Sequence, residues 1–153
     1  MSNEILVGSD SDELDMTQIE TGLAVLRKAC DWAVDQLGGA VPGVQLRALL
    51  IFEDAGGSLD TRQLAAELTT SVTAAGQMCD RMLEAGLVTM EDIDISRGAL
   101  CCVLTDSGTR LARWIKDRQR MALSKVMYSM RPHARDALIH GLRELAAIAP
   151  ETS

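Results

Sequence analysis

The sequence lacks several features that would assign it quickly to a class of protein. Its 153 residues contain no apolar run near the roughly 20 residues that a membrane-spanning helix needs. The opening residues lack the basic start and the small-residue cleavage site of a secretory signal. We therefore expect a cytoplasmic protein with no membrane partner. We also expect a single domain over residues 1–153, because this length leaves little for a second core.

Metal and catalytic motifs are also missing. Four cysteines are present: Cys30, Cys79, Cys101 and Cys102. They show no metal-ligand spacing and no secretory context, so we predict free thiols and no disulfide framework. His133 and His140 have no third ligand near them in the sequence. Without a glycine-rich phosphate loop or a nucleophile paired with histidine, the sequence predicts no enzyme, no metal and no cofactor.

An excess of positive charge is absent as well, since the formal net charge is −7. Affinity for nucleic acid depends largely on Lys and Arg side chains that neutralise phosphates. The total charge taken alone therefore argues against a nucleic-acid partner. The charges are unevenly spread, however: residues 1–59 hold 3 basic and 10 acidic side chains, whereas residues 106–149 hold 9 basic and 4 acidic. Opposite halves of this kind often pair with each other within or between subunits.

The first predicted helix, Met16 to Leu37, carries apolar residues that alternate three and four apart. The residues between its ends that continue the pattern are Ile19, Leu23, Leu26, Cys30 and Ala33. A repeat of 3.5 residues places one narrow stripe against a partner helix. We interpret this stripe as a contact between subunits. The alternative is an ordinary amphipathic helix that packs on its own domain.

Three shorter helices are predicted next. The first lies within VQLRALLIFEDAGG, and Asp60 is a suitable N-cap for the second, TRQLAAEL. After the break TTS, Ser71 caps a third helix that Gly86 ends. Its predicted core positions fit the helical template of i, i+3, i+4, i+7 and i+8: Ala75, Met78, Cys79, Met82 and Leu83. Two helices joined by a tight turn, the second longer, form a helix-turn-helix.

The period of the apolar residues changes beyond Val88. The segment ALCCVLT alternates between two faces, as a strand does, so we predict a β-hairpin over residues 87–105 with its turn at Arg97 and Gly98. A long helix then runs to the residues before Pro132, and a last helix follows it. The sequence predicts a mostly α fold with a small β wing.

In this order, the predicted elements and their motifs resemble the MarR family of winged helix-turn-helix regulators, from about residue 15 to residue 149. The shared motifs are Leu64-Ala65 in the first helix of the helix-turn-helix, Asp80-Arg81 and Glu84 in the recognition helix, Gly86-Leu87-Val88 after it, and Leu104-Thr105-Asp106-Ser107-Gly108 where the wing closes. Each motif is weak alone, and the combination at this spacing carries the resemblance.

The resemblance implies a homodimer. Residues 12–38 and 109–149 would be dimerisation helices, and residues 44–108 would be the winged helix-turn-helix lobe. It further implies a sequence-specific transcriptional regulator, usually a repressor that is released by a small molecule or by thiol oxidation. The DNA would be a palindromic double-stranded operator, with one recognition helix for each half-site in adjacent major grooves.

The chain departs from the family pattern at the positions that contact DNA. Family members often have arginine at the positions of Val72 and Gln77. Here Gln77 would pair with adenine, whereas Val72 and Thr73 would offer methyl contacts to thymine. One wing arginine, Arg97, is kept beside an acidic arm at residues 91–94. The candidate DNA contacts are Arg62, Ser71, Val72, Thr73, Gln77, Arg81 and Arg97.

Two functions follow from these departures. In the first, the dimer binds DNA and represses transcription. In the second, the winged-helix dimer has lost DNA binding and acts through protein–protein contacts, for example as an anti-repressor. The dependence of binding on salt separates the two, because counterion release is expected only of the first.

The resemblance also suggests a small-molecule site between the dimerisation helices and the winged lobe. The residues that would line it are Trp32, Arg47, Phe52, Arg113 and Trp114, and its ligand would be a small anionic or aromatic molecule. The alternative is that these large side chains are plain core. Among the thiols, Cys30 lies in the apolar stripe and Cys79 in the core row of the recognition helix, where a free cysteine behaves as a small hydrophobe.

Overall fold

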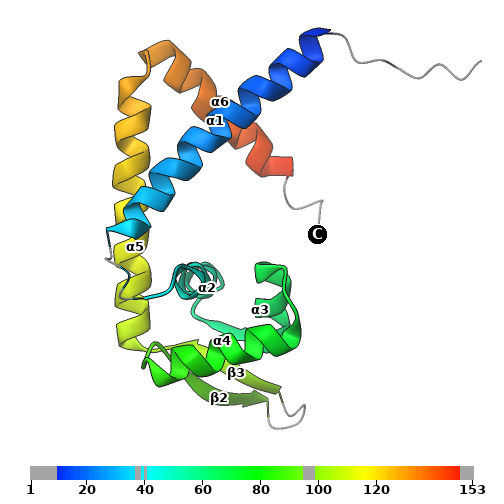
Figure 1. Cartoon of the computed structure of the whole chain (residues 1–153), viewed down its shortest axis with the longest axis vertical. Coiled ribbons are helices and arrows are strands. Elements are labelled where there is room, and N and C mark those ends of the chain that lie inside the picture. Colours follow the sequence, from blue (N-terminus) through cyan, green and yellow to red (C-terminus); the bar gives the residue numbers. More distant parts are fainter. Residues whose placement is uncertain (1–9, 37–38, 40, 95–98, 149–153) are drawn as a thin grey trace, which may run out of the picture. The chain divides into compact units, whose positions relative to one another are not determined.

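The structure of the chain is a computed structural model that describes residues 10–36, 39, 41–94 and 99–148 (Figure 1). These residues belong to two compact units. One unit comprises Ala33–Arg120, called the lobe below, and the other combines Met1–Trp32 with Met121–Ser153. Within the described residues, no helix has the length and apolar character needed to span a bilayer.

The lobe combines three complete helices and the first part of a fourth with a three-stranded antiparallel sheet in the order β1-β3-β2 (Figure 1). Its elements are α2 (Gly43–Asp54), β1 (Ser58–Asp60), α3 (Thr61–Leu68), α4 (Val72–Glu84), β2 (Val88–Asp94), β3 (Ala99–Leu104) and the first part of α5 (Asp106–Ser129). The chain is therefore mostly α with a small β sheet, and the predicted hairpin is confirmed as β2 and β3. The predicted hairpin turn at Arg97 and Gly98 lies outside the described residues.

The core of the lobe gathers side chains from every one of its helices. Its largest fully buried members are Phe52, Leu49, Leu64, Met82, Ile115, Val88 and Cys102. Burying an apolar side chain of this size contributes about 1.5–3 kcal/mol to folding. In α4 the predicted core positions Ala75, Cys79 and Met82 are buried, whereas Leu83 is 43% exposed. The prediction for Leu83 was wrong because the buried face of α4 is narrower than the full template.

The predicted helix caps are confirmed. At the start of α3, Asp60 Oδ1 accepts a hydrogen bond from the Gln63 N–H at 2.8 Å, and Gln63 Oε1 accepts one from the Asp60 N–H at 3.0 Å. This reciprocal pair is a capping box. At the start of α4, Ser71 Oγ accepts from the Ala74 N–H at 3.1 Å. At its end, Gly86 adopts a φ of 70°, which lets the Leu87 N–H donate to the Met82 carbonyl at 2.9 Å.

The turn between α3 and α4 contains a strained residue. Thr69 has a φ of 52°, the only positive value at a non-glycine residue in the described part of the chain. Left-handed backbone is unfavourable for a β-branched side chain. The conformation is held by two hydrogen bonds of the helix end, from the Thr70 N–H to the Ala65 carbonyl at 2.9 Å and from the Thr69 N–H to the Ala66 carbonyl at 3.1 Å.

The strand β1 is absent from the sequence prediction. It has three residues, which is too short for a repeating pattern to be visible. It forms because β3 offers a free edge: Leu59 pairs with Cys102, and the Leu104 N–H donates to the Gly57 carbonyl at 2.8 Å. On the other edge of β3, Met90 of β2 lies opposite the same Cys102.

Thr105 joins the wing to the helix that follows it. Its Oγ1 donates to the Gly86 carbonyl at 2.7 Å and accepts from the Gly108 N–H at 3.0 Å, while its own N–H donates to the Leu87 carbonyl at 3.0 Å. The threonine thus ties the end of the sheet to the start of α5 and to the residues after α4. This network is the physical basis of the leucine-threonine-glycine motif.

The second unit contains α1 (Asp10–Asp35), the later part of α5 and α6 (Pro132–Ile148). The predicted dimerisation helix, residues 12–38, begins two residues after the observed start of α1. Its apolar stripe is open in the single chain, since Met16, Ile19 and Leu23 are each more than half exposed. In α6 the same is true of the apolar residues Leu145 and Ile148.

Candidate nucleic-acid interface

The amino-terminal half of α4 presents uncharged side chains to solvent. Val72 is 52% exposed, and Thr73 and Gln77 are also exposed, whereas Ala75 on the opposite side is fully buried. The packing of Ala75, Cys79 and Met82 fixes this orientation. In helix-turn-helix proteins the amino-terminal residues of the recognition helix contact base edges in the major groove. This half of α4 therefore offers one amide and several methyl groups for that purpose.

Two exposed arginines belong to the two helices of the helix-turn-helix. Arg62 on α3 and Arg81 on α4 are exposed, and neither forms an ion pair with another described residue. Asp80 and Glu84 are exposed on the same helix as Arg81. Arg97, the remaining candidate cation, lies outside the described residues. The exposed surface of α4 is therefore neutral at its start and mixed in charge towards its end.

Ser71 has a structural task in addition to any contact with DNA. Its Oγ caps α4, but its O–H proton is not used by that bond and remains available as a donor. A phosphate next to the start of α4 would accept this proton and would also meet the partial positive charge of the helix amino terminus. The cap and a phosphate contact are therefore compatible.

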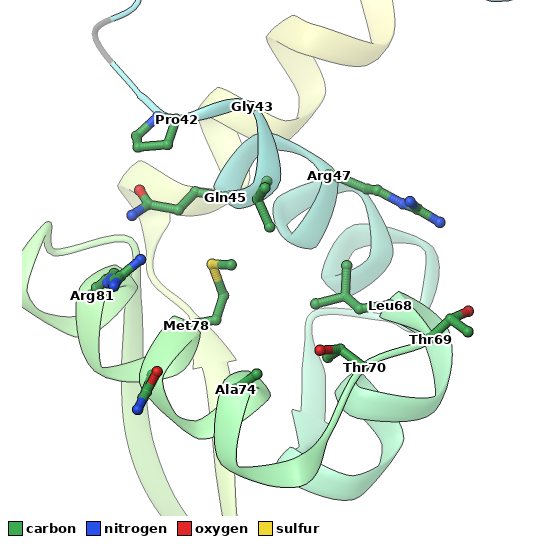
Figure 2. A pocket seen from close by; sticks show the side chains of 12 residues that line it. Pro42, Gly43, Gln45, Arg47, Leu68, Thr69, Thr70, Ala74, Met78 and Arg81 are labelled. Carbon is green, nitrogen blue, oxygen red and sulfur yellow. The ribbon is translucent and has the colours of Figure 1, made fainter.

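A pocket of about 590 Å³ lies between the start of α2, the end of α3 and α4 (Figure 2). Its lining residues are Pro42, Gly43, Val44, Gln45, Arg47, Leu68, Thr69, Thr70, Ala74, Gln77, Met78 and Arg81. Figure 2 shows the Met78 side chain directed from α4 towards α2, with Arg47 and Arg81 at opposite ends of the view. The walls are therefore partly apolar, and each end carries a guanidinium group. Gln77 and Arg81 belong both to this pocket and to the set of predicted DNA contacts.

Three cations near the start of α5 form polar contacts within the lobe. Arg113 Nε lies 3.1 Å from Glu53 Oε1, and Lys116 forms an ion pair with Asp54. Arg110 Nη2 donates to Ser107 Oγ at 3.1 Å. The two ion pairs hold the first turns of α5 against the end of α2. They also reduce the charge that α5 has available for phosphates, compared with Arg62 and Arg81, which form no ion pair with another described residue.

The predicted ligand residues occupy several different environments. Arg47 lines the pocket of Figure 2. Phe52 is fully buried in the core of the lobe, and Trp114 packs against that core with the Arg118 guanidinium 4.9 Å from its ring centre. Trp32 belongs to the other unit, where the Lys125 ammonium lies 5.6 Å from its ring centre. Arg113 pairs with Glu53.

The thiols also differ in environment. Burial and the neighbouring Asp31 carboxylate raise the pKa of Cys30. An interaction between the buried Cys79 and Cys102 thiols lowers the pKa of Cys79 and, together with burial, raises the pKa of Cys102. Cys101 is half-buried beside them on β3. In the described part of the chain, no three His, Cys, Asp or Glu side chains gather as metal ligands.

Comparison with known proteins matches the chain to solved structures, but to no family model and to no curated protein. RV1404 from Mycobacterium tuberculosis is 23% identical with a TM-score of 0.78, covering 92% of this chain and 95% of its own. A MarR family protein from Bacillus stearothermophilus is 15% identical with a TM-score of 0.76, covering 94% and 99%. NadR in complex with 4-hydroxyphenylacetate is 19% identical with a TM-score of 0.62, covering 97% and 99%.

These identities are low, so the similarity concerns the fold. It extends over nearly the whole length of both chains in each comparison. The residues that fold the lobe are those of the quoted motifs: Gly86 ends α4, Leu87 and Val88 are buried, and Thr105 and Gly108 close the wing. The chain therefore has the winged helix-turn-helix fold of MarR family structures.

Proposed function

We propose that this protein is a DNA-binding transcriptional regulator of the MarR type. The observation that carries the proposal is the exposed, uncharged start of α4 within a fold shared with a MarR family protein, together with the exposed Arg62 and Arg81, which form no ion pair with another described residue. Gln77 would pair with a base edge, and the two arginines and the Ser71 hydroxyl would bind phosphates. Arg97 would add a minor-groove contact from the wing. None of these roles requires enzymatic chemistry.

The proposed DNA-binding form is a homodimer. A stripe of exposed apolar residues on α1 and another on α6 support it, because contiguous apolar surface of this kind is rare on a monomer. Two lobes related by two-fold symmetry would contact two half-sites of a palindromic operator. Each recognition helix has few cations and would bind its half-site weakly. Because the dimer joins two such helices, the overall affinity for the whole operator would be higher than the affinity of one lobe for one half-site. Repression would follow where the operator overlaps a promoter.

A small anionic or aromatic molecule is the proposed signal for release of DNA. The pocket of Figure 2 supports this, because it combines apolar walls with Arg47 and Arg81. The related fold of NadR is known in complex with 4-hydroxyphenylacetate. A molecule held in this pocket would contact Gln77 and Arg81, which are the same side chains that DNA would need. Ligand and DNA would therefore compete.

The experiment that tests DNA binding is fluorescence anisotropy of the full chain with its own promoter DNA. It would be measured at about 50 and 200 mM salt, where a protein with several phosphate contacts loses affinity steeply. We expect tight binding that weakens with salt and that Gln77→Ala and Arg81→Ala each reduce. The matched controls are Gln119→Ala and Arg120→Ala on α5, which should bind like the parent chain. Equal effects of the α4 and α5 substitutions would contradict a specific role for α4.

The second candidate function is binding of a protein partner in place of DNA. The exposed carboxylates of Asp80, Glu84 and Glu91 favour it, because they would lie close to the phosphates of a docked duplex and repel them. Absence of binding at about 50 mM salt, to the promoter and to a pool of random sequences, would support this second function. Salt-sensitive binding to the promoter would exclude it.

A further inference from the structure

Gln45 on α2 is buried, although its amide forms no hydrogen bond with another described residue. Its exposed fraction is 9%, and among the residues that the structure describes it is the only polar one that is buried. Every buried side-chain nitrogen or oxygen atom of the described chain has a partner, so the Gln45 amide must be open to solvent. It is open through the pocket of Figure 2, which Gln45 lines. A molecule bound there would supply the partner that this amide lacks.

The start of α2 belongs to the same wall of the pocket. Gly43 and Val44 line it, and their N–H groups form no hydrogen bond with another described residue. Pro42, which precedes them, provides no side-chain cap. The first N–H groups of a helix have no acceptor inside it, and they give its amino terminus a partial charge of about +0.5. The Gln45 amide therefore shares its wall with two further donors and a positive helix end.

The charged side chains that line the pocket are both arginines. Arg47 extends from α2 and Arg81 from α4, and neither forms an ion pair with another described residue. Figure 2 shows the Arg81 guanidinium on the same side of the pocket as Pro42 and the Gln45 amide. Among the described residues, the lining contains no acidic side chain, although the chain has a net charge of −7. The pocket is therefore a positive region of an acidic protein.

We propose that this pocket binds a phosphate monoester of a small organic molecule. The phosphate group would lie between the start of α2 and Arg81. The Gln45 amide and the first N–H groups of α2 would each donate to a phosphate oxygen, and the Arg81 guanidinium would bind two oxygens together. The proposal rests on the ligand pocket of the proposed function and names the chemical class of its ligand.

The charge of the site favours a phosphate monoester over a carboxylate. A phosphate monoester has a charge of about −1.5 to −2 at pH 7 and three strong acceptor oxygens. The Arg81 guanidinium and the helix end together supply about +1.5, and Arg47 adds a further positive charge to the same pocket. A carboxylate has a single negative charge and two oxygens. It would leave part of the positive charge without a partner.

The remainder of the pocket suits the organic part of the ligand. Its volume of about 590 Å³ lies within the range of roughly 300–1,000 Å³ that is typical of small-molecule sites. Figure 2 shows Met78 in the middle of the pocket, with Leu68 and Thr70 on the side away from Pro42. The apolar Met78 and Leu68 would contact an apolar body, and the Thr70 hydroxyl would bind a polar group on it.

Such a ligand would occupy Arg81, which the proposed function assigns to a DNA phosphate. A bound phosphate monoester would therefore remove a cation from the DNA interface. Gln45 is not among the proposed DNA contacts. A substitution at Gln45 consequently separates binding of the ligand from binding of DNA.

The test is isothermal titration calorimetry of the full chain with phenyl phosphate, without DNA. We expect one molecule per chain. The affinity should be about tenfold or more higher than for benzoate, which has a carboxylate on the same ring, or for inorganic phosphate, which has no ring. Gln45→Leu removes the amide but keeps an apolar side chain of similar volume. It should weaken binding of phenyl phosphate about tenfold or more, because a hydrogen bond to a charged group is lost.

The matched controls are Gln119→Leu and Arg120→Ala on α5, since neither residue lines the pocket. Both should bind phenyl phosphate like the parent chain. Circular dichroism verifies that each variant is folded, and Arg81→Ala, at an exposed position, decides the outcome if Gln45→Leu unfolds. The proposal is overturned if the parent chain does not bind phenyl phosphate, or if benzoate or inorganic phosphate binds as tightly. Equal binding by the pocket variants and their controls also overturns it.

Fluorescence anisotropy with promoter DNA separates this site from the proposed function. We expect phenyl phosphate to release DNA from the parent chain. Gln45→Leu should bind DNA with the parent affinity and release it only at roughly tenfold higher phenyl phosphate. If the chain binds phenyl phosphate but not DNA, the proposed function is wrong and the site is supported. If it binds DNA but not phenyl phosphate, the site is wrong and DNA binding is supported.

Discussion

Gly108 shows how a single residue determines the way the wing joins α5. A β-carbon at this position would lie 2.1 Å from the Leu87 carbonyl oxygen and 3.1 Å from Leu104 Cδ2. The residue is buried, and its N–H donates to Thr105 Oγ1. No side chain fits here unless the backbone of Leu87 moves. The glycine of the closing motif is therefore required by close packing of two backbone segments.

We predict that Gly108→Ala lowers the free energy of unfolding by about 3 kcal/mol, at the upper end of the cost of overpacking. Urea denaturation followed by circular dichroism measures this change. The control is Gly76→Ala on α4, where a β-carbon would meet only Thr61 Cγ2 at an ordinary 3.7 Å. That substitution should stabilise by about 0.5–1 kcal/mol, because alanine is favoured in a helix interior. Equal effects at both positions would refute the packing argument.

At Thr69 we predict a substitution that increases the free energy of unfolding. Its left-handed φ of 52° costs about 1–2 kcal/mol for a residue with a β-carbon. Thr69→Gly removes this strain but adds entropy to the unfolded chain, so we expect a net gain of about 0.5–1 kcal/mol in the free energy of unfolding. The neighbouring substitution Thr70→Gly has no such strain to relieve and should destabilise. Thermal melting of both variants tests the pair; a loss of stability in Thr69→Gly would contradict it.

Among single residues, those with local roles were predictable from the sequence. Asp60 and Ser71 were identified as caps because a cap needs only a suitable side chain three residues before an N–H group. That Cys79 and Cys102 belong to one buried core was not predictable, because 23 positions separate them and only the packing of α4 on the sheet brings them together. The strain at Thr69 was also invisible, since threonine is not a residue that favours this conformation.

At the scale of elements, α4 depends on Ser71 for its first turn. The Ser71 cap satisfies an N–H group that has no partner inside the helix. We predict that Ser71→Ala lowers the free energy of unfolding by about 1 kcal/mol, whereas Ser71→Asp retains the parent stability. The carboxylate of the second variant would face DNA phosphates. It should therefore weaken promoter binding in the anisotropy assay although the protein remains as stable as the parent.

The two Ser71 variants separate a structural role from a functional one. If Ser71→Asp binds promoter DNA as tightly as the parent chain, the start of α4 does not approach phosphates. The proposed docking of this helix would then be wrong, whatever the stability of the variant. If both variants lose stability equally, the cap contributes through the packing of its side chain and not through its acceptor oxygen.

Elements with a long repeating pattern were predicted well. The buried row of α4 and the alternation in β3 extend over enough residues to identify a helix and a strand. β1 was missed because three residues contain no period, and it exists only where the edge of β3 is available. The location of the pocket was also not predicted, since it needs the start of α2 to face α4 across the end of α3. Of the residues proposed for a ligand, Arg47 lines it.

At the scale of the whole molecule, part of the charge is neutralised within the lobe, whereas the apolar stripe of α1 is exposed. The cations of α5 neutralise carboxylates of α2 within the lobe, as with Arg113 and Glu53. Part of the positive charge in the last third of the chain therefore forms ion pairs that stabilise the lobe. The apolar stripe of α1, in contrast, is left open by the other residues that the structure describes: Leu23 is 53% exposed. In the proposed homodimer, a second copy of the chain would cover this stripe.

The last prediction concerns that second copy. We expect a dimer by analytical ultracentrifugation and a monomer for Leu23→Glu, because a carboxylate buried in an apolar seam without a partner costs several kcal/mol. Thr21→Glu is the control, since Thr21 is exposed on the same helix but lies outside the stripe; it should remain dimeric. If both variants remain dimers, the stripe is not the subunit contact. If Leu23→Glu is monomeric and also loses its binding to promoter DNA, the two lobes must act together, as expected when each recognition helix alone has too few cations.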